Sequence, residues 1–337
     1  MTPLLPKSAV LAFAAAFFLG SLLLCPLWGS AQLSFHQVFQ NWPPDPDNQD
    51  AQIFFAVRLP RVFLAALAGA AMAACGVVFQ AVLRNPLACP FTLGVAGGSS
   101  FGAVAALALG LTAGWMGLSW VTVFAFLGAL LSVALVYALA SVIRSYSAVT
   151  LLLAGVGINY FFNALVLLFY FLADFTQSYA MMHWLMGSLD VVEWSSVKRL
   201  AFLEAGVLLL LFGLGRDLNL LAAGEELAQA KGVPAPRVIV LSVLAASLLT
   251  SAVVAIAGPI AFVGLIVPHV FRIWVGNDHR VLLAGSALGG AAFLMICDTV
   301  ARSCFGPTEI PVGVLTAILG VPVLLFLLFR RRTYLLN

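Results

Sequence analysis

The sequence divides into ten apolar segments, and these segments constrain the fold more than any other feature. They cover residues 8–29, 54–82, 92–112, 117–141, 149–172, 196–214, 237–257, 259–276, 281–299 and 310–330. Each has about the 17–25 residues that a helix needs to cross the ~30 Å hydrocarbon layer of a bilayer. Because backbone groups find no water there, each span must form its own hydrogen bonds, and the alternating strands of a β-barrel are absent. We therefore predict an all-α polytopic membrane protein, with residues 1–337 forming a single transmembrane domain of about ten spans.

Composition and charge support this prediction and orient the chain. Hydrophobic residues make up 63% of the sequence and charged residues only 9%, whereas about 25% of an ordinary soluble domain is charged. Ten spans with both termini in the cytoplasm place eleven of the sixteen Lys and Arg residues on the cytoplasmic side, as basic residues near span ends prefer. The small net charge of +3 gives no indication of nucleic-acid binding.

The N-terminal segment has two interpretations. Lys7, the apolar run 8–24 and the small residues 29–31 resemble a signal peptide, but the run is also about long enough to span a membrane. We expect a retained first helix, and cleavage would leave the orientation of the later spans unchanged.

Residues typical of catalysis or metal binding do not cluster. The five cysteines are scattered and odd in number, and no C-x-x-C motif occurs. The four histidines are distributed over both predicted sides, and no Ser/His/Asp set or carboxylate pair converges. The sequence therefore predicts no catalytic residues, no metal site and no cofactor.

Two loops are long enough to have a function of their own. The outer loop, 30–53, contains WPPDPDNQD, and the inner loop, 216–237, contains EELAQA, which resembles a short helix ended by Gly232 and Pro234. A PRV triplet opens the second span at residue 60 and the seventh at residue 236, and a Gly/Pro-interrupted segment follows each. Because five spans separate the triplets, this pattern indicates an inverted repeat of the kind that builds many transporters.

The second interrupted segment, GPIAFVGLIVPHVFR at 258–272, places Pro259, Pro268, His269 and Arg272 in an apolar stretch. Carbonyl groups freed by prolines are tolerable only inside protein or beside water. We expect a shortened, bent span with His269 and Arg272 near its inner end, where a structural role is favoured over ligand binding. Glu204 lies midway in the sixth span, and a shift of that span would expose it.

Seven motifs, in order, resemble one known family. They are RLPR at 58–61, GVVFQAVLRNPLACPFTLGVAGGSSFGA at 76–103, LLLAGV at 151–156, WLMGSLD at 184–190, GEELAQAKGV at 224–233, the segment 258–272, and EIPVGVLTAILGVPVLLFLL at 309–328. Together they closely resemble the permease family of ABC importers for iron chelates, haem and cobalamin. The resemblance implies a homodimer that docks two ATPase subunits inside and receives a substrate-binding protein outside.

The resemblance also implies roles for individual residues. Arg58, Arg61 and Arg302 would accept acidic side chains of the binding protein, although Arg58 and Arg61 could instead reach lipid headgroups, and Arg302 could pair with Asp298 four residues away. The remaining implied sites are the ATPase-coupling residues Gly224, Glu225, Glu226, Ala228 and Gly232, the pathway residues Gly155, Asn159 and Asn163, and the inner-gate residues Asn85, Leu87, Ala148 and Val149. For the asparagines, hydrogen bonding between helices is an equal alternative.

These observations predict the passive membrane subunit of an ATP-driven importer in a bacterial inner membrane. The inner loop has no phosphate-binding motif, so ATP hydrolysis is expected on a partner. A ferric siderophore is the preferred substrate, with haem and cobalamin as alternatives. Cobalamin-type members place small hydroxyl residues where this chain has Ala148 and Val149, which weakens that assignment. An ion-driven secondary transporter is a distant alternative, because only Glu204 would supply a buried ionisable group.

Overall fold

The computed structural model describes residues 6–39, 48–111, 114–115, 118–143, 148–190, 193–304 and 309–335. The N-terminal half contains α1 (Lys7–Leu24), the 3-10 turn η1 (Cys25–Leu27), α2 (Phe35–Val38), α3 (Gln49–Gln52), the π-helical turn η2 (Ile53–Arg58), α4 (Leu59–Val82), the 3-10 turn η3 (Pro90–Leu93), α5 (Val95–Ala108), α6 (Trp120–Val142) and α7 (Ala148–Leu172). Two short strands precede α6, and β1 (Gly114–Trp115) pairs antiparallel with β2 (Leu118–Ser119).

The C-terminal half contains α8 (Phe175–Leu185), α9 (Trp194–Gly213), α10 (Gly215–Ala223), α11 (Glu225–Ala230), α12 (Ala235–Ala257), α13 (Val263–Val275), α14 (His279–Ser303) and α15 (Val312–Leu335). The all-helical class is thus confirmed, and every predicted apolar segment contains a helix. Within the described residues, six helical runs are long and apolar enough to cross a membrane, while α5, α13 and the described part of α15 are shorter apolar helices. The number of spans stays a prediction.

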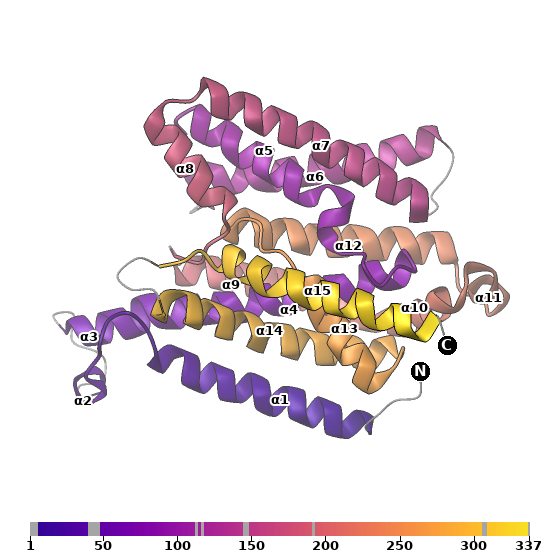
Figure 1. Cartoon of the computed structure of the whole chain (residues 1–337), viewed down its shortest axis with the longest axis horizontal. Coiled ribbons are helices and arrows are strands. Elements are labelled where there is room, and N and C mark those ends of the chain that lie inside the picture. The colour runs from indigo at the N-terminus through magenta and orange to yellow at the C-terminus, as the bar shows by residue number, and fades with distance from the viewer. Residues whose placement is uncertain are drawn as a thin grey trace.

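The long helices lie side by side in one bundle (Figure 1). The start of α1, the end of α15, α10 and α11 lie at one end, and α2 and α3 lie at the other. We call these the α11 end and the α3 end. The start of α1, the end of α15 and the predicted inner loop lie at the same end of the bundle, which agrees with an even number of membrane crossings.

Asp278 ties three elements together at the α11 end. Its carboxylate accepts hydrogen bonds from Lys7 of α1 (2.5 Å) and Asn219 of α10 (3.2 Å), and it caps α14. Partial burial alone would raise the pKa of Asp278, but the hydrogen bonds from Lys7 and Asn219 outweigh it, so its pKa lies below the ordinary value. The first helix is therefore held against α14 by charge as well as by packing.

Helix α4 forms the centre of the bundle and owes this place to its small residues. The helical run Gln49–Val82, which contains α4, is 83% buried in its most apolar stretch, against 28% for the runs that contain α1 and α7. Added Cβ atoms would lie 1.8 Å from the Gly264 carbonyl oxygen at Gly76, and 2.2 Å from the Gly290 oxygen at Gly69. Glycine at these positions lets the α13 and α14 backbones approach α4 closely, as small residues do in membrane bundles.

We expect Gly76→Ala to lower the stability of the protein by at least about 2 kcal/mol, because the new methyl group forces α4 and α13 apart. Gly206→Ala on α9 is the matched control, since no heavy atom lies within 4 Å of its added Cβ. Thermal unfolding of both variants in detergent provides the measurement. Equal melting temperatures would show that the α4–α13 approach is not tight.

Both interrupted segments break their helices, as the sequence predicts. After α4, the chain forms η3 and turns at Gly94 (φ 77°) before α5 begins. After α12, residues 258–262 are non-helical, with Gly258 at φ 68° and Phe262 at φ 69°, before α13 begins. The eighth apolar segment therefore becomes helical only at Val263, not at residue 259, because the chain must turn there first.

Candidate functional site

On α7, the predicted pathway helix, Asn159 faces a neighbouring helix and Asn163 is exposed. The Asn159 carboxamide oxygen accepts a hydrogen bond from the Gly97 N–H (3.0 Å), a first-turn amide of α5 that lacks a partner within its own helix. Gly155 is buried against the backbone of η3, where an added Cβ would lie 2.2 Å from the Thr92 carbonyl oxygen. Hydrogen bonding between helices thus accounts for Asn159. Asn163 is exposed, and its pathway role stays a prediction.

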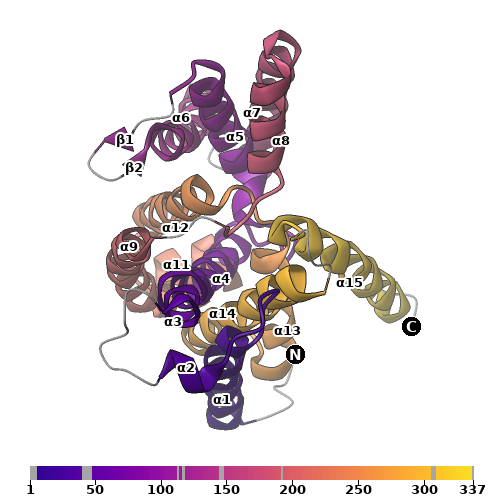
Figure 2. The same cartoon turned by 90° about the vertical axis from the view of Figure 1, so that its left-hand side faces the viewer.

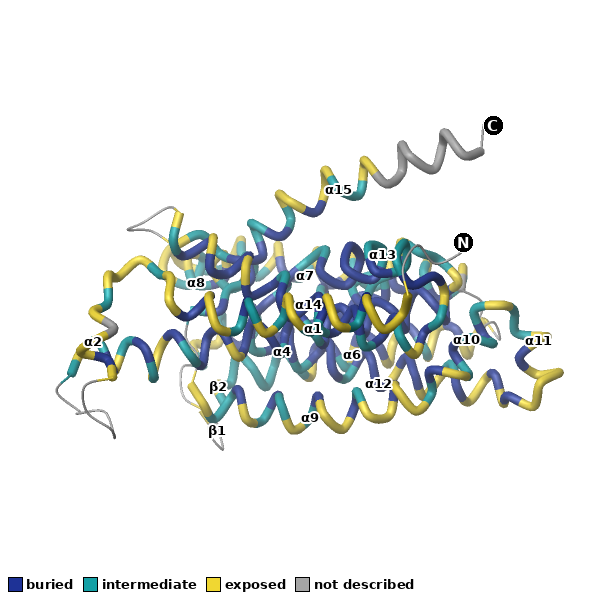
Figure 3. Tube along the Cα trace, turned by 90° about the horizontal axis from the view of Figure 1, so that it is seen from below, coloured by how far each residue is buried: buried dark blue, intermediate teal, exposed yellow. Residues whose placement is uncertain are grey.

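Two helices expose apolar surface on the same side of the bundle. On α7, Tyr160, Phe161 and Leu167 are exposed, and on α15, Ile318 and Phe326 are exposed. Figures 2 and 3 show that α15 leaves the bundle toward its C-terminal end, and Figure 2 shows α7 and α8 grouped with α5 and α6. The surface of α7 also carries the amide of Asn163, and an amide is unfavourable against lipid tails.

The predicted coupling segment, residues 224–232, has the expected local structure. Helix α11 is EELAQA, preceded by Gly224 (φ 140°) and followed by Gly232 (φ 81°). Ala228 is fully buried and anchors the segment, whereas Glu226 and Leu227 are exposed. The segment therefore projects from the α11 end of the bundle and is held there by the buried side chain of Ala228. Helix α10 was not predicted; Leu218 and Leu221, three residues apart and both buried, are the signal that identifies it.

The predicted inner-gate residues lie on two loops. The end of α4 and the start of α7 both lie at the α11 end (Figure 1). Asn85 accepts a hydrogen bond from the Leu87 N–H (3.0 Å), which fixes a local turn. Leu87 and Val149 are exposed, and the side chain of Ala148 is outside the described residues. A gating role for this group stays a prediction.

The three arginines expected to face a docking protein are buried instead. Arg58, Arg61 and Arg302 are 4%, 6% and 4% exposed. Arg61 binds the Asp298 carboxylate through Nε (3.0 Å) and Nη2 (2.9 Å), and its Nη1 donates to Glu309 (2.6 Å). Arg61 lies on α4, Asp298 on α14 and Glu309 before α15, so the two ion pairs join three parts of the chain, and the Arg61–Asp298 pair is buried.

Arg58 and Arg302 hold the end of the first helix. Arg58 donates to the carbonyls of Pro26 and Leu27 (3.2 Å each) and of Ala31, and Arg302 donates to the carbonyl of Cys25 (2.6 Å). Carbonyls at a helix C-terminus lack intrahelical partners and carry partial negative charge, so cations stabilise them.

The Arg302–Asp298 pair (3.6 Å) is also present, as the alternative interpretation predicts. Burial does not favour docking by these side chains, and that role stays a prediction.

Three of the seven motifs meet near the α3 end in what we call the glycine joint: Gly187, Gly258 and Gly313. The Ser188 N–H donates to the Ala257 carbonyl (2.9 Å), and the Gly313 N–H donates to the Gly187 carbonyl (3.0 Å). Added Cβ atoms at the three glycines would lie 2.3–2.6 Å from carbonyl oxygens of neighbouring segments. The ends of α8 and α12 and the start of α15 are thus linked through their backbones. This joint was not predicted, because the motifs lie far apart in sequence.

Glu204 is also buried, so the observed position of α9 does not expose it. It is 3% exposed, and among the described residues its Oε2 has no hydrogen-bond partner. In the same part of the chain, no group of three or more His, Cys, Asp or Glu side chains is arranged to hold a metal ion.

A bundle of apolar helices, two helices broken at matching places and a short helix projecting at one end define a membrane transport subunit. The chain belongs to the FecCD transport family, whose model matches residues 15–330. The resemblance carried by the seven motifs is confirmed.

Individual relatives agree with this membership. The cobalamin import system permease of Halobacterium salinarum is 43% identical over 276 residues, which is 82% of this chain and 73% of that protein. The hemin transport system permease of Yersinia pestis is 37% identical over 306 residues, 90% of each chain. A solved structure described as an inward-facing metal-chelate type ABC transporter shares 31% identity, with a TM-score of 0.84 over 96% of this chain and 99% of that one.

Proposed function

We propose that this chain is the permease subunit of an ATP-driven importer, and that the α11 end meets the ATPase in the cytoplasm. The observation that carries the proposal is the coupling segment: α11 stands out between Gly224 and Gly232 with Glu226 and Leu227 exposed. A short exposed helix on an anchored base suits insertion into a cleft of a partner. On this proposal the start of α1 and the end of α15 face the cytoplasm, and the binding protein docks at the α3 end.

We further propose that two copies pair through the exposed faces of α7 and α15. The exposed amide of Asn163 on α7 is unfavourable against lipid tails, and pairing would turn Asn163 of each copy away from lipid and toward a shared path. Two ATPase subunits would then serve one pathway.

We propose a ferric siderophore as the cargo, with haem and cobalamin as alternatives. The relatives named above carry cobalamin and hemin, and the iron(3+)-hydroxamate import permease of Bacillus subtilis is 37% identical over 93% of this chain. Ala148 and Val149 stand where cobalamin-type permeases place small hydroxyl residues, which favours an iron chelate over cobalamin.

The test is reconstitution of the permease in lipid vesicles with its ATPase and its binding protein. We expect ATP-dependent uptake, with hydrolysis stimulated most by binding protein loaded with a ferric hydroxamate and less by protein loaded with haem or cobalamin. Vesicles that lack the ATPase but carry a proton or sodium gradient form the control. Uptake in those vesicles would overturn the proposal in favour of a secondary transporter.

A further inference from the structure

A groove opens between three helices on a side of the bundle that the proposed dimer does not use. It has a volume of about 290 Å³ and lies between α6, α9 and α12. The residues that line it are Leu118, Thr122, Val123, Phe126, Leu127, Arg199, Leu200, Leu203, Ala252, Ala255 and Ile256. Figure 2 shows α6, α12 and α9 on the side away from α15.

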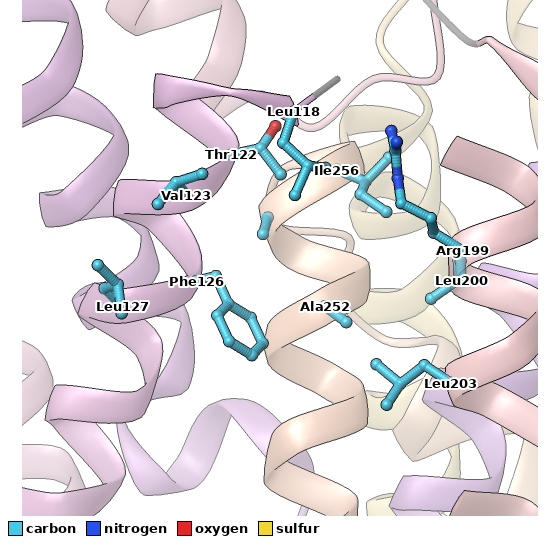
Figure 4. A pocket seen from close by; sticks show the side chains of 11 residues that line it. Leu118, Thr122, Val123, Phe126, Leu127, Arg199, Leu200, Leu203, Ala252 and Ile256 are labelled. Atoms are coloured by element: carbon cyan, nitrogen blue, oxygen red, sulfur yellow. The ribbon is translucent and has the colours of Figure 1, made fainter. Parts of the chain in front are cut away.

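The groove exists because α12 places small residues between two helices with larger ones. Ala252 and Ala255 line the groove from α12, whereas Phe126 of α6 and Leu203 of α9 line it from either side (Figure 4). The small side chains of Ala252 and Ala255 leave space that the flanking helices do not fill, and the larger Ile256 of α12 lines the groove at its Arg199 end. On α12 the lining runs from Ala252 to Ile256, close to the C-terminal end of that helix.

The chemistry of the lining indicates an apolar chain as the occupant. Nine of the eleven lining residues are hydrophobic, and only Thr122 and Arg199 carry polar side-chain groups. The surrounding surface is apolar as well, since Leu127 is 55% exposed and Phe202 is 86% exposed. A volume near the lower end of the ~300–1,000 Å³ range of small-molecule pockets suits one hydrocarbon chain better than a bulky polar chelate.

The single charge of the lining lies at one end of the groove. In Figure 4 the Arg199 guanidinium points toward the level of Leu118 and Thr122, and Leu203 lies further along the groove. This level is the start of α6 and of α9, at the α3 end. The guanidinium donates to the Ser196 hydroxyl (3.1 Å), which steadies it along the first turn of α9. An anionic phosphate at that position would gain a charge-assisted hydrogen bond.

We propose that this groove binds one phospholipid from the membrane leaflet at the α3 end. An acyl chain lies along Ala252 between Phe126 and Leu203, and the phosphate contacts Arg199. The groove matches both parts of a phospholipid, because its apolar lining contacts the acyl chain and the Arg199 guanidinium contacts the phosphate at the depth of the headgroups. The lipid would cover α12, the helix that connects the coupling segment to residues 258–262.

The experiment is native mass spectrometry of the delipidated full chain, titrated with dioleoylphosphatidylglycerol and, separately, with dioleoylphosphatidylcholine. We expect one tightly bound lipid of either type, with the anionic lipid preferred because its headgroup adds no second cation to compete with Arg199. Ala252→Phe fills the groove and should abolish this site for both lipids. Arg199→Gln removes the headgroup contact and should weaken phosphatidylglycerol binding about tenfold, as expected for a lost contact of about 1.4 kcal/mol.

Lys198→Gln is the matched control, because Lys198 is the neighbouring cation on α9 and does not line the groove. Its lipid affinity should equal that of the unmodified chain. If Ala252→Phe does not fold, the Arg199 and Lys198 variants still decide the question, since both change only a side chain near the surface. Equal lipid affinities in these two variants would overturn the proposal. A folded Ala252→Phe variant that keeps its lipid but loses the binding protein would instead assign the groove to a protein interface.

Discussion

Replacing Asp298 with Asn is expected to destabilise the protein by about 3–5 kcal/mol, because the change leaves the buried Arg61 guanidinium without its principal counter-charge. Asp298 is 1% exposed, accepts hydrogen bonds from both Nε and Nη2 of Arg61, and pairs with Arg302. A loss of that size is a large part of the ~5–15 kcal/mol by which proteins are usually stable. Thermal unfolding in detergent and the yield of folded protein in the membrane provide the measurement.

Glu309→Gln is the matched control for this prediction. Glu309 binds the same guanidinium, but 35% of its side chain is exposed, so water can replace the contact. We expect its loss to change stability by less than about 1 kcal/mol. If the Asp298 and Glu309 variants melted at the same temperature, the Arg61–Asp298 pair would not be an essential contact of the fold.

The same geometry changes how docking must be tested. Reversing the charges of Arg58 and Arg61 would remove the ion pairs to Asp298 and the hydrogen bonds to Pro26 and Leu27 at once. Such a variant would fail through misfolding whether or not the arginines meet a partner. A docking experiment therefore needs substitutions on the exposed surface of the α3 end.

Replacing Leu227 with Ala is expected to lower ATP-driven uptake at least about tenfold, while the permease itself stays folded. Under the proposed function, α11 enters a cleft on the ATPase, and a central apolar side chain at such an interface is worth about 2 kcal/mol or more. Leu227 is 46% exposed, so its removal leaves no cavity in the subunit. The measurement is chelate-stimulated ATP hydrolysis and uptake in vesicles.

Leu241→Ala on α12 is the matched control, because Leu241 is 45% exposed but lies outside the coupling segment. We expect this variant to transport like the unmodified chain. Equal uptake by the Leu227 and Leu241 variants would contradict the assignment of α11 as the coupling element, although the chain could still be a permease.

Local features of the sequence were predicted well. Apolar length located the helices, since membrane burial requires a continuous run of residues. Glycines set the ends of EELAQA, and the Gly/Pro clusters at 84–98 and 258–272 located the two breaks, because these residues act on their own backbone.

The partners of buried polar groups could not be predicted. Arg61 and Asp298 are 237 residues apart, and Asn159 and Gly97 are 62 apart. Spacing along one helix gives the face on which a residue lies, but not the helix that covers that face. A charge near the end of a span can therefore meet a carboxylate, a lipid headgroup or a partner protein with the same local pattern. Arg61 is paired with a carboxylate, whereas the buried Oε2 of Glu204 has no hydrogen-bond partner among the described residues, and neither result could be read from the local sequence.

The glycine joint links the ends of α8 and α12 to the start of α15 through backbone contacts alone. Its contacts are peptide N–H and carbonyl groups of residues 187–188, 257 and 313, so it requires small residues at fixed places but no particular side-chain chemistry. Under the proposed function, side chains that face the cargo can therefore differ between permeases while the backbone contacts of the glycine joint are kept. Redesign for a different cargo would change residues of the proposed pathway, such as Asn163, and leave Gly187, Gly258 and Gly313 unchanged.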